Sequence, residues 1–378
     1  MKKYDRLRLT SACAFGRNKF CAAFSEAEYD DMYSFILVFE GDFEQPWTRF
    51  DIPRIIDSTT GWLGADGKPV VYVKSDEGDV YSLSAGEEPR HEKIEGSGVY
   101  SEDAAGLGYT NRIVTINKTL FVTGYHSQLY WRTGSAWGWF HKEQLPRPEV
   151  GYEYLIFGDL AGSSENDLYM SVTYSPASTT RKLTEEEEER AAELFDLGRV
   201  DEALAIHHAA EGESRVLEGR LYHWNGTAWR IVATPRSGKF YAEPATLSDI
   251  LVENSERVWA VGNNGVILLG NARDGFQDIS FKGNDGDLRS VTKFKGRIVV
   301  ASDYALHWFD GHVLSPLKPV LDPKINKNVP TPVKVQAVDD ILYYFDSKHG
   351  IHTFDGDRWR QIEVPPALLA REFKGLAQ

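Results

Sequence analysis

The chain of 378 residues carries 56 acidic and 42 basic side chains, which gives a formal net charge of −14 at pH 7. A field of this sign opposes binding to nucleic acid or to an anionic membrane, because both are themselves negatively charged. No apolar run reaches the roughly 18 residues that a membrane-spanning helix needs. Residues 1–8 also lack the apolar segment of an export signal. We therefore expect a cytoplasmic protein that binds neither nucleic acid nor membrane.

The two cysteines, Cys13 and Cys21, lie close together near the start of the chain. Two cysteines in a chain of this length do not make the disulfide framework of a small secreted protein. One disulfide between them is open as an alternative, but buried free thiols are the favoured interpretation.

Short runs rich in β-branched and aromatic residues recur along the chain between polar or glycine turns, which is the pattern of β-strands joined by hairpins. First runs include Arg112–Ile116, Leu247–Val252 and Leu288–Phe294. The second runs are Phe20–Phe24, Val70–Val73, Leu120–Thr123, Leu168–Val172, Val258–Val261, Ile298–Ala301 and Ile341–Phe345. Third runs lie at 35–39, 80–83, 129–131, 221–224, 266–269, 306–309 and 349–354. A glycine turn follows each third run, at Gly41, Gly86, Gly134, Gly226, Gly275, Gly311 and Gly356.

The last repeat shows the complete unit. Val333–Val338 supplies its first strand, and Trp359–Val364 follows the glycine turn as a fourth. Each repeat is therefore predicted to be an antiparallel meander of four strands, and a period of about 45 residues is typical of propeller blades. Residues 7–9 either add to this last repeat or begin the first one.

Two motifs carry a resemblance to known proteins. Residues 258–267, VWAVGNNGVI, resemble a bacterial propeller repeat of the form "VWAVG-x-x-G-x-I", and residues 221–229, LYHWNGTAW, resemble its "hWnG-x-x-W" half. Over nearly its full length the chain looks like a seven-bladed β-propeller. The resemblance implies an all-β fold of seven four-stranded antiparallel blades in one domain, residues 1–378. Propellers include enzymes, lectins and binding scaffolds, so it leaves the function open.

A helical insertion is predicted within the fourth blade, over residues 177–216, because Gly134 and Gly226 are 92 residues apart. Thr184 and Glu187 have the spacing of a capping box, and acidic residues fill the first turn, as the helix dipole favours. Gly198 is a plausible end, and Val200–Ile206 begins a second helix. Residues 193–211 resemble half of a tetratricopeptide helical hairpin.

The insertion is strongly acidic. Residues 183–214 hold eleven acids and two bases, Arg190 and Arg199, for a net charge of −9. In a propeller, the turns between second and third strands lie on the face that usually binds ligands, and other turns of that face are also acidic. We therefore predict an acidic face that binds a basic partner. The predicted contact residues are Glu185, Glu186, Glu189, Arg190, Glu193, Asp196, Asp201, Glu202, Asp30, Asp31, Asp76 and Glu77. A solubilising role for the same charges is the alternative.

Motifs for phosphate loops, nucleophile elbows, zinc sites and calcium loops are missing from the sequence. No catalytic residue, cofactor or metal site is therefore predicted. Tyr125, His126 and Trp131 form an aromatic group that could stack on a sugar or a base. Packing between blades is the favoured interpretation for this group.

The resulting hypothesis is a non-enzymatic protein-binding propeller, monomeric when free, that binds a basic protein partner. An immunity protein that covers the active site of a toxin is one concrete form of it, because a negative field speeds the capture of a basic target. The alternatives are a carbohydrate-active or other hydrolytic enzyme, with carboxylates and tryptophans around the central channel, and a structural scaffold in a permanent assembly.

Overall fold

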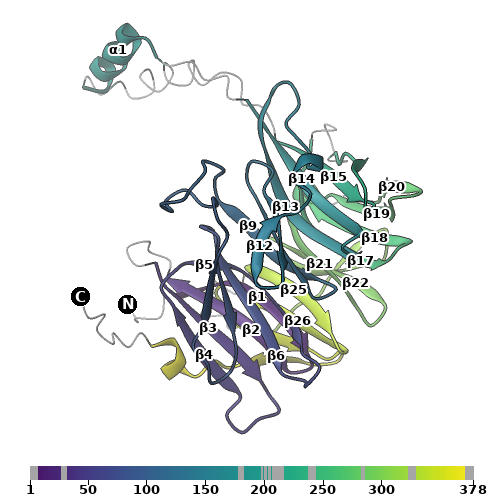
Figure 1. The fold of residues 1–378 in the computed structure, drawn as a ribbon. Helices are drawn as coiled ribbons and strands as arrows, with labels where there is room; N and C mark the ends of the chain where they lie inside the picture. The colour runs from purple at the N-terminus through teal and green to yellow at the C-terminus, as the bar shows by residue number, and fades with distance from the viewer. Residues whose placement is uncertain are drawn as a thin grey trace, which may run out of the picture.

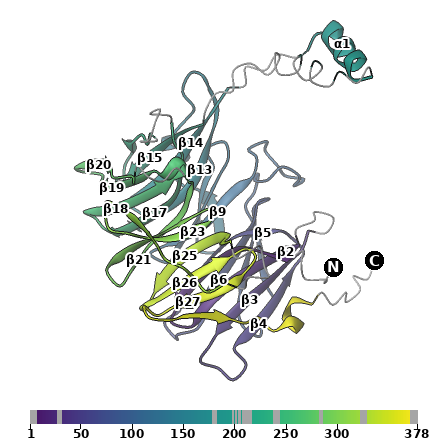
Figure 2. The same cartoon turned by 180° about the vertical axis from the view of Figure 1, so that it is seen from behind.

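The computed structural model describes residues 7–26, 32–177, 183–196, 199, 202, 206, 217–236, 244–281, 286–321 and 329–370. These residues form seven four-stranded sheets, and in each sheet the strands lie side by side in chain order. The sheets are arranged around a common axis as the blades of a propeller (Figure 1, Figure 2). The predicted all-β, seven-bladed propeller of antiparallel blades is therefore confirmed.

The first strand of each blade packs beside the first strands of the neighbouring blades, so these strands surround the axis. They are β1 (Leu7–Gly16), β5 (Ile56–Leu63), β9 (Thr110–Ile116), β13 (Tyr152–Ser164), β17 (Leu247–Asn254), β21 (Leu288–Phe294) and β25 (Pro332–Val338). The second strands are β2 (Lys19–Glu26), β6 (Pro69–Ser75), β10 (Thr119–Gly124), β14 (Asp167–Pro176), β18 (Arg257–Gly262), β22 (Arg297–Ser302) and β26 (Ile341–Asp346).

The third strands follow outward from the axis. They are β3 (Ser34–Glu40), β7 (Asp79–Leu83), β11 (Leu129–Thr133), β15 (Glu218–Trp224), β19 (Ile267–Asn271), β23 (Ala305–Phe309) and β27 (Gly350–Phe354). The outermost strands are β4 (Trp47–Ile52), β8 (Arg90–Lys93), β12 (Ala136–Trp139), β16 (Trp229–Ala233), β20 (Gly275–Asp278), β24 (Leu314–Pro316) and β28 (Trp359–Ile362). Short 3₁₀ helices are η1 (Lys142–Gln144), η2 (Asn263–Gly265) and η4 (Pro366–Leu369).

The glycine turns that marked the repeats lie between third and fourth strands, and all of these glycines except Gly41 have positive φ. At Gly311 (φ 101°) a side chain completes the turn: a carboxylate oxygen of Asp310 accepts hydrogen bonds from the N–H groups of His312 and Val313. Asp355 does the same beside Gly356. Glycine tolerates the left-handed backbone, and the preceding acid satisfies the turn donors.

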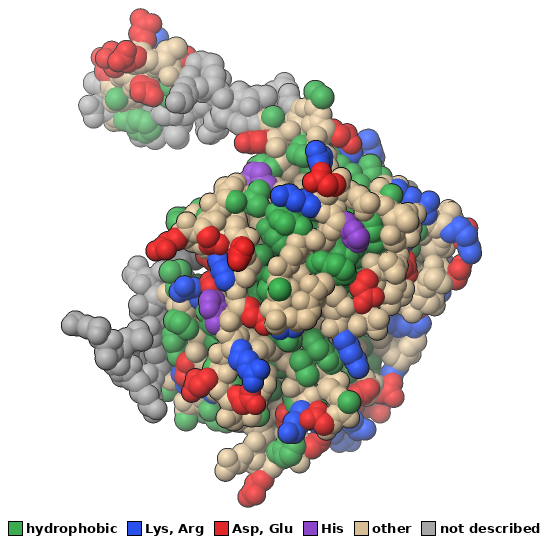
Figure 3. Space-filling model, viewed as in Figure 1, with side chains coloured by type: hydrophobic (Ala, Val, Ile, Leu, Met, Phe, Trp, Pro, Cys, Tyr) green, Lys and Arg blue, Asp and Glu red, His purple; other side chains and the backbone are tan. Residues whose placement is uncertain are grey.

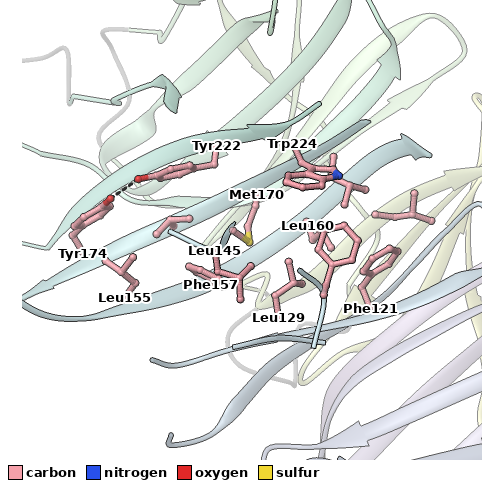
Figure 4. Packing of buried hydrophobic residues seen from close by; sticks show 14 residues of the cluster. Phe121, Leu129, Leu145, Leu155, Phe157, Leu160, Met170, Tyr174, Tyr222 and Trp224 are labelled. Carbon is pink, nitrogen blue, oxygen red and sulfur yellow. Dashed lines mark hydrogen bonds between the residues drawn. The ribbon is translucent and has the colours of Figure 1, made fainter. Parts of the chain in front are cut away.

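A cluster of buried apolar side chains fills each of the seven junctions between neighbouring blades. Figure 4 shows the junction of the third and fourth blades, where Phe121 and Leu129 meet Phe157 and Met170, and Tyr174 is hydrogen-bonded to Tyr222. Both faces of every blade are thus covered by its neighbours. Burial of this kind is the main stabilising term of the ring.

Among the described residues, the ring closes without exchange of a strand between the first and last blades. Leu7 belongs to β1, and β1 packs beside β25. The side-chain amide of Gln336 accepts from the Ala14 N–H at 2.9 Å and donates to the Ala14 carbonyl at 2.9 Å. Phe20 and Tyr343 lie in the shared apolar cluster of this junction. Residues 7–9 therefore begin the first blade.

Cys13 and Cys21 are cross-strand partners in the β1–β2 pair, and both are buried free thiols. The favoured interpretation of the two cysteines is confirmed.

The helix α1 (Glu185–Asp196) follows β14 and precedes β15 in chain order. Figure 1 and Figure 2 show it standing clear of the blades. The predicted second helix, 200–206, falls almost entirely outside the described residues, so the tetratricopeptide resemblance stays a prediction. No helix of the described residues is long and apolar enough to cross a membrane.

Candidate functional site

One face of the propeller carries the links between second and third strands and the links from one blade to the next. We call it the loop face. The alternation of strand direction within each blade places all these links together, and the turns between first and second strands on the opposite face. β14 ends and β15 begins on the loop face, so α1 is connected to it at both ends.

Four tyrosines from three separate segments form a row on the loop face. Ring centroids are 6.5 Å apart for Tyr100 and Tyr109, 6.5 Å for Tyr109 and Tyr125, and 6.2 Å for Tyr125 and Tyr154. Tyr100 is 83% exposed, and the other three are half-buried. We call these residues the tyrosine row.

Backbone hydrogen bonds fix the segments that carry the row. Tyr125 N–H donates to the Tyr109 carbonyl at 3.0 Å, and Ser127 N–H donates to the Leu155 carbonyl at 3.2 Å. The fully buried amide of Gln128 donates to the carbonyls of Leu107, Gly108 and Tyr109. The tyrosine rings therefore stand on a rigid support, which lowers the entropy lost when a partner orders them.

Glu77 holds the exposed end of the row. One of its carboxylate oxygens accepts from the N–H groups of Val99 and Tyr100 at 3.0 and 2.9 Å, and from the Ser101 hydroxyl at 3.2 Å. These hydrogen bonds position Tyr100, and the predicted contact of Glu77 with a partner stays a prediction. A side-chain hydrogen bond in which the Tyr109 hydroxyl donates to Tyr100 is the main cause that raises the pKa of Tyr109 to about 12.

Asp76 lies beside Glu77 and is partly buried. Burial raises the pKa of its carboxyl group, while the neighbouring Lys74 opposes the rise. Its backbone carbonyl accepts from the N–H of Thr110, which links the second and third blades.

The predicted aromatic group divides in the structure. Tyr125 belongs to the tyrosine row, and the His126 ring lies 4.8 Å from Tyr154 at its edge. Trp131 instead packs against the core of the junction between the third and fourth blades, with its ring 5.3 Å from Phe140. A cavity of about 270 Å³ adjoins His126 and is lined by Trp139, Lys142, Leu145, Pro146, Arg147 and Pro148, among others.

Five residues at or beside the loop-face ends of β13, β14 and β15 form a compact polar group; we call it the Arg220 cluster. The Arg220 guanidinium lies 3.9 Å from the Tyr174 ring centroid. It makes ion pairs with Glu149 at 2.5 Å and with Glu218 at 2.9 Å, and Tyr152 donates to Glu218 at 2.8 Å. Hydrogen bonding to Glu149 raises the pKa of Arg220 further, so this side chain stays charged.

The helix α1 begins with the predicted capping box. The Thr184 N–H donates to Glu187 at 2.9 Å, and the Glu187 N–H donates to the Thr184 hydroxyl at 3.3 Å. Ala191 and Leu194 are buried and Glu187 is half-buried, whereas the other acidic residues of α1 whose side chains are described are exposed. The exposed predicted contact residues on α1 are Glu185, Glu186, Glu189, Arg190 and Glu193.

Other predicted contact residues are less well defined. Glu202 is exposed and forms an ion pair with Arg199 at 2.5 Å. The structure describes the backbone of Asp196 but not its side chain, and Asp30, Asp31 and Asp201 fall outside the described residues.

Several acids of the loop-face links are already engaged by bases. Asp79 contacts Arg54 at 3.0 Å and His91 at 2.7 Å, and Asp287 contacts Arg289 at 3.2 Å. Figure 3 shows acidic side chains gathered on α1, while acidic and basic side chains are interspersed over the visible face of the blades. In this view α1 differs from the blades, because its acidic side chains lie together and those of the blades are mixed with basic ones.

The described residues contain no group of three or more histidine, cysteine, aspartate or glutamate side chains able to hold a metal ion. His223 contacts Asp167 at 2.8 Å and His352 contacts the His349 carbonyl at 3.2 Å, both within single blades. The two histidines thus have partners within the fold.

No protein-family model matches the chain, and no curated protein matches it. Solved structures do match over almost its whole length. The WD40 β-propeller domain of Doa1 has a TM-score of 0.53 and 10% identity, covering 95% of this chain and 96% of that one. Virginiamycin B lyase from Staphylococcus aureus has a TM-score of 0.57 and 9% identity, covering 93% and 95%. The extracellular domain of BT4673 from B. thetaiotaomicron has a TM-score of 0.54 and 12% identity, covering 93% and 38%. At these identities the likeness shows the β-propeller fold alone.

Proposed function

We propose that the chain is a non-enzymatic, protein-binding propeller whose loop face binds a basic partner protein. In this proposal the helical insertion, residues 177–216 of the fourth blade, is an arm that contacts the partner beside the tyrosine row. The single observation that carries the proposal is that row: four tyrosines on a rigid support, with Tyr100 83% exposed.

Tyrosine rings on a fixed backbone suit protein recognition. They present a large apolar surface with a polar tip, and they lose little conformational freedom on binding. Alanine scans of interfaces find tyrosine among the residues that contribute most to affinity. Tyrosine faces also attract the cationic groups of lysine and arginine, which agrees with a basic partner.

The acidic helix would act mainly on the rate of association. The exposed glutamates of α1 make a local negative field, and such a field speeds encounter with a positively charged surface at low ionic strength. A toxin with a basic active-site surface is one partner of this kind, and the chain would then serve as its immunity protein. The proposal includes no cofactor, and it treats the free protein as a monomer.

The test begins with affinity capture by the full-length chain and identification of the bound protein by mass spectrometry. Binding of that purified protein is then measured by surface plasmon resonance for two variants. Y100A/Y125A shortens the row, and E185Q/E186Q/E189Q/E193Q removes four of the seven negative charges of α1 while it keeps the capping residue Glu187. E44Q/D66N/E87Q/E88Q is the matched control, because these four exposed acids lie in turns of the opposite face.

We expect Y100A/Y125A to speed dissociation about tenfold or more. The α1 variant should slow association about tenfold at low salt, with a smaller difference at high salt. Association and dissociation rates that match the wild type in both variants would contradict the proposal. So would an equal loss of binding in the control variant.

A further inference from the structure

The innermost strand of every blade is bulged near its loop-face end. The pairing of the first and second strands shifts register after Leu9, Ile56, Thr110, Phe157, Leu247, Leu288 and Pro332. A bulge turns the extra residue away from the regular pleat, and bulges often re-aim side chains at functional sites. Here a bulge occurs near the loop-face end of the first strand in all seven blades.

The residues at these bulges surround the axis, and we call them the channel ring. Its members are Thr10, Asp57, Asn111, Arg112, Gly158, Asp159, Ser248, Arg289 and Val333. Two adjoining cavities of about 290 and 280 Å³ share Asn111, Arg112, Asp159 and Val333 as lining residues. Every member of the channel ring lines one cavity or the other, so the bulges build a polar chamber in the channel.

The acidic groups in and beside the chamber already have partners within the protein. A carboxylate oxygen of Asp159 accepts from the Ile250 N–H at 2.8 Å. Asp249, just outside the lining, accepts from the Val291 N–H at 2.7 Å and the Ser290 hydroxyl at 2.9 Å. Asp57 forms an ion pair with the fully buried Lys74 at 2.8 Å. Asp159 and Asp249 thus join successive blades, whereas Asp57 is paired within the second blade.

The basic groups are less fully engaged. Arg112 donates to the Ser248 carbonyl at 3.0 Å, but its nearest atom is 3.5 Å from Asp159, longer than a normal hydrogen bond. Lys334, which lines the second cavity, makes no side-chain hydrogen bond or ion pair with any described residue. Arg289 is held by Asp287 and Asp303. Arg112 and Lys334 therefore offer positive charge to the chamber.

We propose that the channel chamber binds a compact anion, a carboxylate or phosphate group, between Arg112 and Lys334. Thr10, Ser11 and Thr59 line the same cavity. The Thr10 hydroxyl donates to the Ile56 carbonyl at 2.8 Å, and the Ser11 and Thr59 hydroxyls are hydrogen-bonded to each other at 3.1 Å, so one hydroxyl of that pair can still donate to an anion. Buried donors and cations around a small polar cavity are the usual means of binding such an ion. The tryptophans expected of a carbohydrate-active channel do not line either cavity among the described residues. This site is separate from the tyrosine row and does not rest on the proposed function.

Protonation of the chamber acids should strengthen anion binding. Burial raises the pKa of Asp159 to about 7, with Arg112 and Lys334 opposing the rise and Asp249 adding to it. Burial also raises the pKa of Asp57 to about 6 against the opposing effect of Lys74, with Asp76 adding to the rise. As the pH falls from 8 to 6, these acids lose negative charge, and the chamber repels an anion less.

The test is isothermal titration of the full-length protein with citrate and, separately, with inorganic phosphate, at pH 8 and pH 6. The variant is K334M, which removes the unpaired ammonium and keeps an unbranched side chain. K68M is the control, because Lys68 is exposed in a turn of the opposite face. A circular dichroism melt checks that each variant is folded, and D159N provides a second variant with the acid neutralised.

We expect at least one of the two anions to bind, more tightly at pH 6 than at pH 8. K334M should weaken that binding about tenfold, as for the loss of one charge-assisted hydrogen bond, and K68M should leave it unchanged. D159N should bind more tightly than the wild type at pH 8. Absence of binding by both anions at pH 6, or equal affinity of folded K334M and wild type, would overturn the proposal. Citrate binding without phosphate binding would assign the site to carboxylates, and the reverse to phosphates.

Discussion

The ring of blades and the helix α1 are stabilised in different ways. Each blade buries apolar side chains against both neighbours, and hydrogen bonds such as those from Ile250 to Asp159 join successive innermost strands. In α1, by contrast, Ala191 and Leu194 are buried and most other side chains are exposed. The comparison indicates that contacts between blades stabilise the ring, which is a rigid platform. The charged arm is stabilised by contacts within its own segment.

The largest effect is expected where the ring closes. Phe20 is fully buried between the first and last blades, with its ring 6.0 Å from Tyr343 and 4.9 Å from Phe39. Phe20→Ala should lower the free energy of unfolding by about 3–5 kcal/mol, because it leaves a cavity in a packed junction. Urea denaturation measures the loss. Tyr304→Ala, at a residue 70% exposed, is the control and should cost no more than about 0.5 kcal/mol. Similar losses of unfolding free energy in the two variants would mean that packing at this junction does not stabilise the ring.

A smaller effect is expected where the arm joins the ring. The Arg220 side chain is only 11% exposed and holds Glu149, Glu218 and Tyr174 together. Arg220→Met should destabilise the protein by about 1–2 kcal/mol, since it removes charge-assisted hydrogen bonds from a partly buried group. Arg147→Met, which breaks an exposed pair with Glu143, should have no measurable effect in the same urea titration. An unchanged free energy of unfolding for Arg220→Met would show that the Arg220 cluster does not stabilise the ends of β14 and β15, where the arm is connected.

The channel acids give a pH-dependent effect of about 1 kcal/mol. The pKa of Asp159 is about 7 in the folded protein, against about 3.9 in an unfolded chain. The folded state therefore binds more protons between these values, and stability falls as the pH rises toward 7. Relative to D159N, the wild type should gain about 1 kcal/mol of unfolding free energy from pH 8 to pH 6. If the unfolding free energies of the two proteins change in parallel over this range, the raised pKa of Asp159 is contradicted.

The smallest effect on the whole molecule is expected from the capping box of α1. Thr184→Ala removes the hydroxyl that caps the helix, worth about 1 kcal/mol to the helix itself. Hydrogen exchange of the α1 amides should quicken about fivefold, since local opening is favoured by that amount. The urea midpoint of the whole protein should not move. A shift of that midpoint would show that α1 and the blades unfold together, and Thr184→Ser should restore slow exchange.

The fold could be predicted from the sequence because its signals are local. Strand composition, glycine turns and the length of the repeat all lie within single blades, so seven blades could be recognised from the pattern. The capping box of α1 was also visible, because it needs only Thr184 and Glu187. Ring closure was left open, since the contact between Ala14 and Gln336 joins opposite ends of the chain.

The candidate site was harder to predict because it is assembled across blades. Tyr100 and Tyr154 are far apart in sequence, and only the packing of neighbouring blades brings them into one row. Tyr125 and His126 were noticed as aromatic residues, but Trp131 was grouped with them although it packs into a junction. Glu77 looked like a free surface acid until its hydrogen bonds to Val99 and Tyr100 were visible. The bulges of the channel ring shift single residues and leave no mark in the hydrophobic pattern.

Hydrogen exchange of the full-length chain with and without its captured partner tests the central claim most directly. Our account predicts slower exchange in the segments that carry the tyrosine row, residues 97–110, 124–128 and 152–156, and in α1. The turns of the opposite face, at 64–68, 117–119 and 295–297, should be unaffected. Protection confined to those turns, with the tyrosine row and α1 unchanged, would contradict the account.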